Sequence, residues 1–600
     1  MTARPIRAGA APLTPTAVGT WAIVALAAVG VWASTAAWLA GQAATWWNIR
    51  RWAPTDWSAT LIIDTLTEPA ATWPKATPNL LWLLVGLLTV APLLLVGWVW
   101  GRWWGRQPAS DAPHRSLASA HQLRALTVPQ RRQTAKRLRA SLADTPTRTI
   151  TAGDAGIVLG RLDRGPTGAG PLLLAGWEDV IVAVMAPRQG KTSSLVVPTI
   201  LAAPGAVVAT SNKTDILDTA ALRRRLTGQP VWVFDPQAVA HTRQDMWWNP
   251  LAGVDGVEAA ERLAGHFLTG VRSDKDPTWH SAATELLGGL FLAAALGGQE
   301  MSRVYQWLHT EAATEAPAIL RRHGFHDTAA SLLGLSQLPH ETRGSVFFTA
   351  RAGAACLRNP DIVKWVSPRP DLPQFHPAAF VATRETLYLL SKDGGGSAAP
   401  LTTAFADAVI RAGERAGTAA GGRLDPPLTM TLDEAANVVR IKDLPELASH
   451  AGSRGVIVMV ILQSFPQGER VWSDGGMKAL WSAATIKLVG PGQDDDTFLD
   501  GVSKLVGEQW VTTSGHSISH GGRHGSSTSS STSTTRQRIL DPGALRALPF
   551  GSALLIPAAA PSALLRLQPA YLGPHRQALA AAAVELREQV AANATSGGHQ

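Results

Sequence analysis

One stretch of this 600-residue chain has residue types whose order could hold a phosphate chain. It follows the apolar run Val180–Met185 and reads Met185-Ala186-Pro187-Arg188-Gln189-Gly190-Lys191-Thr192. Where such a loop joins a strand to a helix, its backbone amides wrap the β-phosphate and the helix N-terminus adds positive potential. Lys191 would reach the β- and γ-phosphates, and the Thr192 hydroxyl would coordinate Mg²⁺. We predict a site for ATP and Mg²⁺ whose cofactor-binding residues are Ala186, Pro187, Arg188, Gln189, Gly190, Lys191, Thr192 and Ser193.

The first position of this loop departs from the pattern G-x-x-x-x-G-K-[ST], because Met185 stands where a glycine is usual. Methionine does not easily take a positive φ, so we expect the chain to enter the loop with ordinary strand geometry. The rate of hydrolysis is the property that this substitution puts in question.

A second stretch, Leu428–Glu434, has the pattern of an apolar strand that ends in two carboxylates. Asp433 would hold Mg²⁺, and Glu434 would polarise the attacking water, a role that suits a carboxylate beside the metal. An ordinary acidic strand end is the alternative, but the phosphate-binding loop earlier in the chain favours the catalytic interpretation.

Polar residues also follow other expected strands, and open α/β sheets bind ligands at the carboxyl ends of their strands. Gln463, directly after the run Val456–Leu462, would sense the γ-phosphate; a solvated strand end is the alternative. Arg454 precedes the same run and could stabilise transition-state charge at the phosphate of a neighbouring subunit, or it could be a turn residue without a catalytic role. The predicted catalytic residues are Glu434, Lys191, Gln463 and Arg454, and the predicted metal ligands are Thr192 and Asp433.

The segments around these motifs predict an α/β fold. From about residue 150 onward, short runs of Val, Ile and Leu alternate with longer mixed stretches, which is typical of a parallel sheet. Such runs are missing between about 255 and 380, where Ser281–Leu296 and Arg343–Leu357 have a helical pattern. We predict a RecA-like P-loop NTPase domain over 151–255 and 381–570, interrupted by an all-α domain over 256–380.

The first 106 residues contain two long uncharged segments. No charged residue lies between Arg7 and Arg50 or between Lys75 and Arg102, and the apolar parts, 18–40 and 80–101, are long enough to cross a hydrocarbon layer of about 30 Å. A cleaved signal peptide is the alternative for the first segment, but its length and the second segment disfavour it. We predict a transmembrane hairpin over 1–106 in a multi-pass protein of the cell membrane, with the ATPase domain in the cytoplasm.

The remaining segments and the overall charge suggest partners more than chemistry. The net charge of +9 favours a partner with phosphate groups, and residues 107–150 form a basic linker.

We predict a flexible loop over 513–535, which is mostly Ser, Thr, Gly and His, and a C-terminal helix and tail over 571–600. The single cysteine, Cys356, excludes an intrachain disulfide and a multi-cysteine zinc site.

These features together resemble type IV secretion coupling proteins of the TraG/TraD class, particularly actinobacterial members. Further matching motifs are Val233-Phe234-Asp235-Pro236, Trp248-Asn249-Pro250-Leu251, Thr386-Leu387-Tyr388-Leu389, Gln463-Ser464 and Leu548-Pro549-Phe550-Gly551. The resemblance implies an ATP hydrolase that delivers relaxase-bound single-stranded DNA to a type IV secretion channel during conjugation. It also implies a homohexameric ring at the membrane, with DNA, a relaxase or other secreted protein, and the channel proteins as partners, and a helical insertion that selects the substrate.

Two alternative functions stay open. An FtsK-like pump for double-stranded DNA shares the P-loop sheet, although the long all-α insertion and the lack of a C-terminal winged-helix module disfavour it. A membrane receptor that binds nucleotide only to switch its protein partners is the other. Because five tryptophans lie in the loop 43–78, we also expect this loop to dock the channel or a neighbouring subunit.

Overall fold

The computed structural model describes residues 15–104, 116–165, 168–271, 277–310, 314–392, 397–520 and 526–596. The chain divides into two compact units. The first consists of Met1–Asp111 and Trp510–Gln537, and the second of Ala112–Gln509 and Arg538–Gln600, so that the phosphate-binding loop belongs to the second unit.

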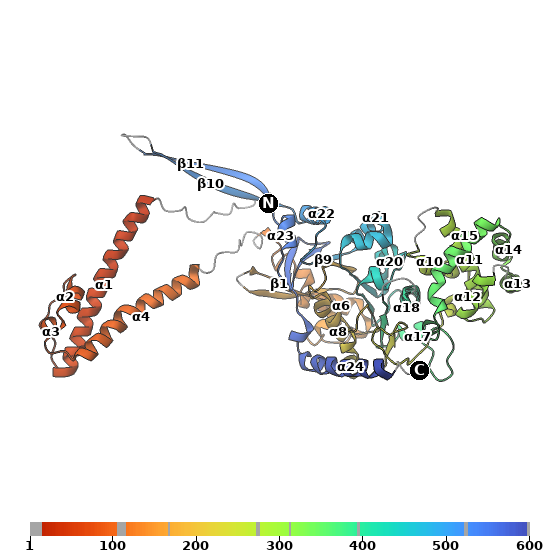
Figure 1. The fold of residues 1–600 in the computed structure, drawn as a ribbon, viewed down its shortest axis with the longest axis horizontal. Helices are drawn as coiled ribbons and strands as arrows, with labels where there is room; N and C mark the ends of the chain where they lie inside the picture. Colours follow the sequence, from red (N-terminus) through yellow and green to blue (C-terminus); the bar gives the residue numbers. More distant parts are fainter. Residues whose placement is uncertain are drawn as a thin grey trace. The chain divides into compact units, whose positions relative to one another are not determined.

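The N-terminal part of the first unit is a helical hairpin (Figure 1). Its helices are α1 (Pro15–Ile49), α2 (Leu61–Thr67), α3 (Pro69–Thr72) and α4 (Pro78–Trp104). A small apolar cluster of Ala40, Ala44, Leu61, Trp73, Leu81 and Val85 joins them. Trp73 packs directly on Gly41, which has no side chain to obstruct the ring, and its indole N–H donates to Thr65 Oγ1 at 3.0 Å. The short connecting helices are therefore held against α1.

The prediction of a two-span membrane anchor is wrong. Among the residues that the structure describes, no helix is both long enough and apolar enough to cross a membrane, which also overturns the predicted location in the cell membrane. The prediction counted uncharged residues and overlooked polar ones: Ser34 Oγ donates to the Ala59 carbonyl at 2.7 Å, and Gln42 Oε1 accepts from the Ala53 amide at 2.8 Å. The flanking residues 1–14 and 105–115 lie outside the described part of the chain.

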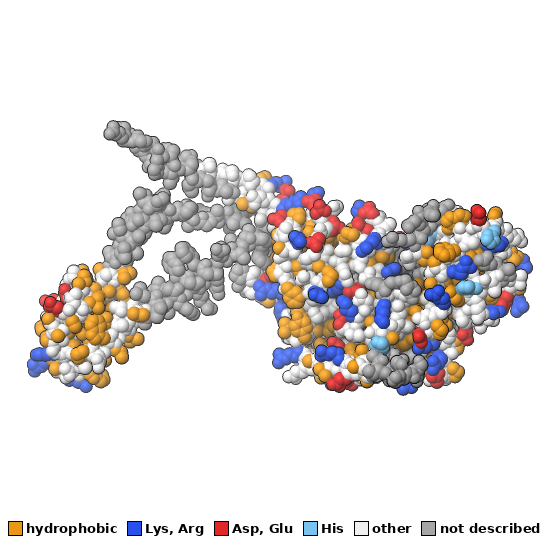
Figure 2. All heavy atoms as spheres, in the orientation of Figure 1, with side chains coloured by type: hydrophobic (Ala, Val, Ile, Leu, Met, Phe, Trp, Pro, Cys, Tyr) orange, Lys and Arg blue, Asp and Glu red, His pale blue; other side chains and the backbone are white. Residues whose placement is uncertain are grey.

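Hydrophobic side chains cover much of the visible face of this hairpin (Figure 2). Trp46, Trp47, Trp52 and Trp57 line a hollow of about 790 Å³ together with polar residues, while the fifth tryptophan of the loop, Trp73, is buried. The role of this loop in docking a partner stays a prediction.

The second unit is built on an eleven-stranded sheet with the order β2-β1-β13-β12-β9-β3-β8-β7-β4-β6-β5. The strands are β1 (Ile157–Asp163), β2 (Ala169–Ala175), β3 (Ile181–Val184), β4 (Val207–Ser211), β5 (Val231–Phe234), β6 (Thr386–Leu390), β7 (Leu428–Leu432), β8 (Val456–Leu462), β9 (Ile486–Val489), β12 (Ser552–Pro557) and β13 (Ala563–Arg566). From β9 to β5 the strands are parallel, whereas β12, β13, β1 and β2 extend the sheet in antiparallel fashion. The predicted α/β sheet is thus confirmed.

Both faces of the parallel part are buried, as parallel sheets require. Along β8, Val456, Val458, Val460 and Leu462 belong to one hydrophobic core, and Ile457, Met459 and Ile461 belong to the core of the opposite face. Helices and turns that cover the two faces or precede the sheet are η1 (Arg124–Leu126), α6 (Val128–Leu138), η2 (Ala140–Leu142), α7 (Ala152–Ala155), η4 (Thr192–Val196), α8 (Val197–Ala202), η5 (Leu217–Thr219), α9 (Ala220–Thr227), α18 (Ala399–Ala419), α19 (Ala435–Val438), α20 (Leu444–His450), η8 (Ala451–Arg454), α21 (Phe465–Ala483), α22 (Asp496–Val506), α23 (Pro542–Arg546), η9 (Ala570–Leu572) and α24 (Arg576–Ser596).

Between β5 and β6 the chain is helical (Figure 1). The elements are η6 (Pro250–Gly253), α10 (Val257–Leu268), α11 (Pro277–Leu296), α12 (Met301–Thr310), α13 (Glu315–Arg322), α14 (His326–Ser336), α15 (His340–Gly353), η7 (Ala354–Arg358), α16 (Pro360–Val363) and α17 (Pro377–Phe380). Their buried side chains are continuous with the core on one face of the sheet. The insertion therefore shares a core with the sheet, and its boundary as a separate domain stays a prediction.

The structure differs from the sequence-based prediction over 513–535. Instead of a flexible loop, β10 (Glu508–His520) and β11 (Ser526–Arg538) pair as a two-stranded sheet. The prediction rested on the lack of residues that could form a core, but the threonines that recur in this segment have a high strand propensity. The tip, 521–525, which includes His524, lies outside the described residues.

We expect Cys356 to be inert in the folded protein. The thiol is buried in the helical insertion, and burial raises its pKa to about 12, so the reactive thiolate is scarce at pH 8. The measurement is the rate of reaction with a colorimetric disulfide reagent. The native chain should react far more slowly than the chain in guanidinium chloride, and rapid reaction of the native chain would show that the insertion opens readily.

Candidate nucleotide site

The register of three neighbouring strands brings the predicted sequence motifs to one edge of the sheet. β8 lies between β3 and β7, with Leu462 opposite Val184 and Val460 opposite Leu432. Because the three strands are parallel, the residues that follow them meet at one edge of the sheet. This edge therefore holds the phosphate-binding loop, the two carboxylates and Gln463.

The chain enters the loop through Met185 in strand geometry, as predicted. The Met185 amide donates to the Leu462 carbonyl at 3.0 Å, and positive φ angles appear only further along, at Arg188 (62°) and Gly190 (79°). The methionine side chain is fully buried and packs on Gly490, where an added Cβ would lie only 2.6 Å from Met185 Cγ. The missing side chain at Gly490 thus provides the space that Met185 needs.

Thr192 and Asp433, the predicted metal ligands, are in direct contact. Thr192 Oγ1 donates to Asp433 Oδ2 at 2.6 Å, and Thr210 Oγ1 donates to the Asp433 backbone carbonyl at 2.8 Å. Burial raises the pKa of Asp433 to about 6, although the charge of Lys191 and the hydrogen bond from Thr192 oppose the shift. Such a carboxylate gains from a cation, and an oxygen pair of this kind suits Mg²⁺.

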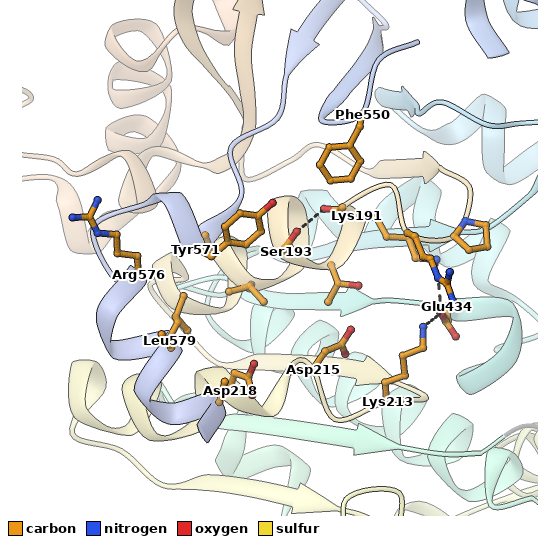
Figure 3. Close-up of a pocket in the computed structure, with 18 of the residues that line it drawn as sticks. Lys191, Ser193, Lys213, Asp215, Asp218, Glu434, Phe550, Tyr571, Arg576 and Leu579 are labelled. Atoms are coloured by element: carbon orange, nitrogen blue, oxygen red, sulfur yellow. Dashed lines mark hydrogen bonds and ion pairs between the residues drawn. The ribbon is translucent and has the colours of Figure 1, made fainter. Parts of the chain in front are cut away.

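Glu434 is the centre of the site's contacts (Figure 3). Its Oε1 accepts from Gln463 Nε2 at 2.9 Å and lies 3.7 Å from both Lys191 Nζ and Lys213 Nζ. The Glu434 backbone is in the left-handed region, with φ 53° and ψ 42°. A non-glycine residue in this conformation is under strain, which is frequent at functional sites.

Several buried polar atoms around Glu434 lack a hydrogen-bond partner within the described part of the chain. They are Lys191 Nζ, Ser194 Oγ and Glu434 Oε2, and the Lys191 and Glu434 side chains are only 7% and 3% exposed. Leaving a buried polar group unpaired costs about 1–3 kcal/mol, so these atoms indicate a ligand that completes them. A triphosphate with Mg²⁺ and water would supply an acceptor for the lysine and a donor for the glutamate, which both line the cavity.

Lys191, Thr192 and Glu434 line one end of a cavity of about 620 Å³. The wall of the other end comes from the C-terminal segment and includes Ala570, Tyr571, Arg576, Leu579, Ala580 and Ala583. Phe550 lies beside the loop, with its ring 3.6 Å from where a Cβ of Gly190 would be.

The structure brings most of the predicted site residues together, but Arg454 lies elsewhere. Pro187, Arg188, Gly190 and Ser193 line the cavity, whereas Ala186 is buried beneath the loop and Gln189 approaches Gly492. Arg454 lies before β8 and Gln463 after it, so a single chain places this arginine at the opposite edge of the sheet. There its Nη1 is 3.9 Å from Glu414 Oε1.

Sequence reasoning missed two contributions. Lys213 follows β4 and contacts Glu434; its position after an apolar strand was a signal, but a weak one. The wall formed by Tyr571 and Leu579 gave no signal, because it depends on where an alanine-rich helix packs in three dimensions.

One region of the chain matches a known protein family. Residues 427–550, which include β7, Asp433, Glu434 and Gln463, match the family TraG-D_C, described as the TraM recognition site of TraD and TraG. Over these residues the chain is similar to coupling proteins of the TraG/TraD type. The narrower expectation of an actinobacterial member stays a prediction. No curated protein matches the chain.

Solved structures show similarity at low identity. The bacterial conjugative coupling protein TrwBdeltaN70, in its unbound monoclinic form, is 17% identical, with a TM-score of 0.49, over 65% of this chain and 84% of that chain. Plasmid coupling protein TrwB in complex with ADP and Mg²⁺ is 17% identical, with a TM-score of 0.48, over 66% and 87%. VirB4 of Thermoanaerobacter pseudethanolicus is 13% identical, with a TM-score of 0.41, over 70% and 98%. The architecture of this chain is defined by its own strand order and register.

We predict that Gly490→Ala displaces the phosphate-binding loop. The new Cβ would meet Met185 Cγ, Cε and Cβ at 2.6, 2.7 and 2.9 Å, and overpacking of this kind costs about 1–3 kcal/mol. The melting temperature and the ATP affinity should both fall. In the double variant with Met185→Ala, which removes two of the three contacts, both should partly recover.

Gly501→Ala is the matched control, because an added Cβ there meets nothing within 4 Å. Its ATP affinity should stay near that of the wild type, and its melting temperature should not fall, because alanine is more favourable than glycine within a helix such as α22. A Gly490→Ala variant that behaves like this control would show that Met185 and Gly490 are not in tight contact.

Proposed function

We propose that this chain is a coupling ATPase of conjugation, which binds ATP with Mg²⁺ and uses hydrolysis to deliver relaxase-bound DNA to a type IV secretion channel. The observation that carries the proposal is the contact set around Glu434, where the residues after β3, β7 and β8 meet. The TraG/TraD-type match over 427–550 supplies the context of conjugation.

Each residue of the site has a role that its position supports. Thr192 and Asp433 would hold Mg²⁺, which supplies charge neutralisation of the phosphates when bound. Lys191, whose ammonium group lacks a hydrogen-bond partner among the described residues, would bind the terminal phosphates. Glu434 would accept the proton of the attacking water through its unpaired Oε2, while Gln463 fixes the orientation of the same carboxylate through Oε1.

Lys213 adds a positioning role to this scheme. Its side chain is 64% exposed, and its ammonium group lies 3.7 Å from Glu434 Oε1, the oxygen that Lys191 also approaches. A γ-phosphate beside Glu434 would compete for both lysines. We infer that arrival of the nucleotide draws both ammonium groups toward the phosphates and away from Glu434.

The partners in the proposal rest on charge and on the family description. Lys and Arg side chains are spread over the second unit and interspersed with acidic ones on the face in Figure 2, within a chain of net charge +9. The net positive charge supports contact with a nucleic acid. The description of 427–550 as a TraM recognition site supports a protein partner of the DNA-processing kind. The helical insertion would select the cargo. A homohexameric ring, in which Arg454 reaches a neighbouring subunit, completes the proposal.

Glu434→Gln should separate binding from hydrolysis. The variant keeps the shape of the side chain but removes the base, so ATP affinity should stay close to that of the wild type while turnover falls by about 10²–10⁴-fold. Lys191→Ala should lose ATP affinity as well. The measurements are calorimetric titration with ATP and steady-state phosphate release, with and without single-stranded or duplex DNA.

Glu446→Gln is the matched control, because Glu446 is an exposed carboxylate on α20 that does not line the cavity. It should hydrolyse ATP like the wild type. Equal turnover by the wild type, Glu434→Gln and Lys191→Ala would refute hydrolysis at this site. Stimulation by duplex DNA alone would favour a pump for double-stranded DNA instead.

A further inference from the structure

The cavity extends well beyond the phosphate-binding loop. In Figure 3, Glu434 and Lys191 lie at one end, Ser193 lies between, and Tyr571 and Arg576 lie at the other end. If ATP binds as proposed, its γ-phosphate lies beside Glu434, and the rest of the molecule must continue past Ser193. The nucleoside is thereby directed toward the C-terminal segment.

The far end of the cavity has an apolar wall that is held in place. Leu579 of α24 is buried against Val197 of α8 and Leu222 of α9, with Ala570 and Ala578 at the border of this small cluster. Because α8 continues directly from the phosphate-binding loop, the wall has a fixed relation to the phosphate site. A flat aromatic base would find apolar surface here without further rearrangement.

Two aromatic side chains border the cavity, and their positions differ. Phe550 lies over Gly190, within reach of the phosphates, and therefore covers the loop. Tyr571 is 51% exposed and lies past Ser193, beside the Leu579 wall, so that one surface of its ring is available to a ligand. Stacking on an aromatic ring is a common and strong contact for a nucleic acid base.

We propose that the C-terminal segment 570–583 forms the nucleoside subsite, in which the base stacks on Tyr571 and rests on the wall formed by Leu579 and Val197. This inference rests on the proposed function and adds where the base binds, together with a preference for purine over pyrimidine nucleoside triphosphates. The larger ring system of a purine covers more of Tyr571 and of the wall than a pyrimidine does, so ATP and GTP bind more tightly than CTP and UTP.

The test compares ATP with inorganic tripolyphosphate, a probe that has the phosphates but no nucleoside. Calorimetric titration in the presence of Mg²⁺ uses the full chain and its variants. Tyr571→Ala should weaken ATP binding about tenfold, consistent with the loss of one stacked base, and leave tripolyphosphate binding unchanged. Tyr571→Phe, which keeps the ring, should bind ATP like the wild type. The preference for ATP over CTP should shrink in Tyr571→Ala.

Leu572→Ala is the matched control, since Leu572 is adjacent in sequence, 72% exposed and outside the cavity lining. It should bind both ligands like the wild type. Unchanged ATP affinity in Tyr571→Ala, or an equal loss for ATP and tripolyphosphate, would overturn the subsite. A wild-type chain that binds neither ligand would instead refute the proposed nucleotide site itself, so the two failures are distinguishable.

Discussion

Parallel pairing of β8 with β3 on one side and β7 on the other is the constraint on which the site depends. Backbone hydrogen bonds fix the register, and the register decides which residues emerge together at the carboxyl edge. The loop after β3 then faces the carboxylates after β7, and Gln463 is inserted between them. A shift of one residue would turn every side chain of β8 to the other face and move its end away from Glu434. The two large cores stabilise this register, because each receives alternate side chains of the same strand.

The same edge gathers charges that the free protein does not fully balance. Asp433 is ionised less readily than in the unfolded chain, so its ionisation lowers the stability of the free protein as the pH rises from about 4 to about 6. Glu434 is shared by Lys191 and Lys213, yet its second oxygen has no hydrogen-bond partner among the described residues. A ligand that carries both cation and phosphate would relieve all of these groups at once. Binding of such a ligand would therefore stabilise the folded chain.

Sequence patterns predicted the buried parts of this structure well and its contacts poorly. The predicted run Val456–Leu462 coincides with β8, because a strand buried on both faces is a continuous apolar run. The same reasoning failed at α1, where a lack of charge concealed the polar contacts of Ser34 and Gln42. Tyr571 could not be predicted as part of the site, since its place follows from the packing of α24 on a distant segment. Local patterns report burial, whereas such placements depend on residues far apart in the chain.

The fit between Met185 and Gly490 has a consequence for how this chain can change over evolutionary time. A methionine at the first position of the loop is acceptable only while position 490 lacks a side chain, because three of its atoms would lie within 3 Å of a Cβ there. Alanine at 185 would remove two of these three contacts, and glycine would remove all three. Substitutions at the two positions are therefore epistatic, and their order matters. While position 185 is methionine, position 490 cannot accept a side chain without strain. Positions 185 and 490, far apart in the chain, thus share one mutational path.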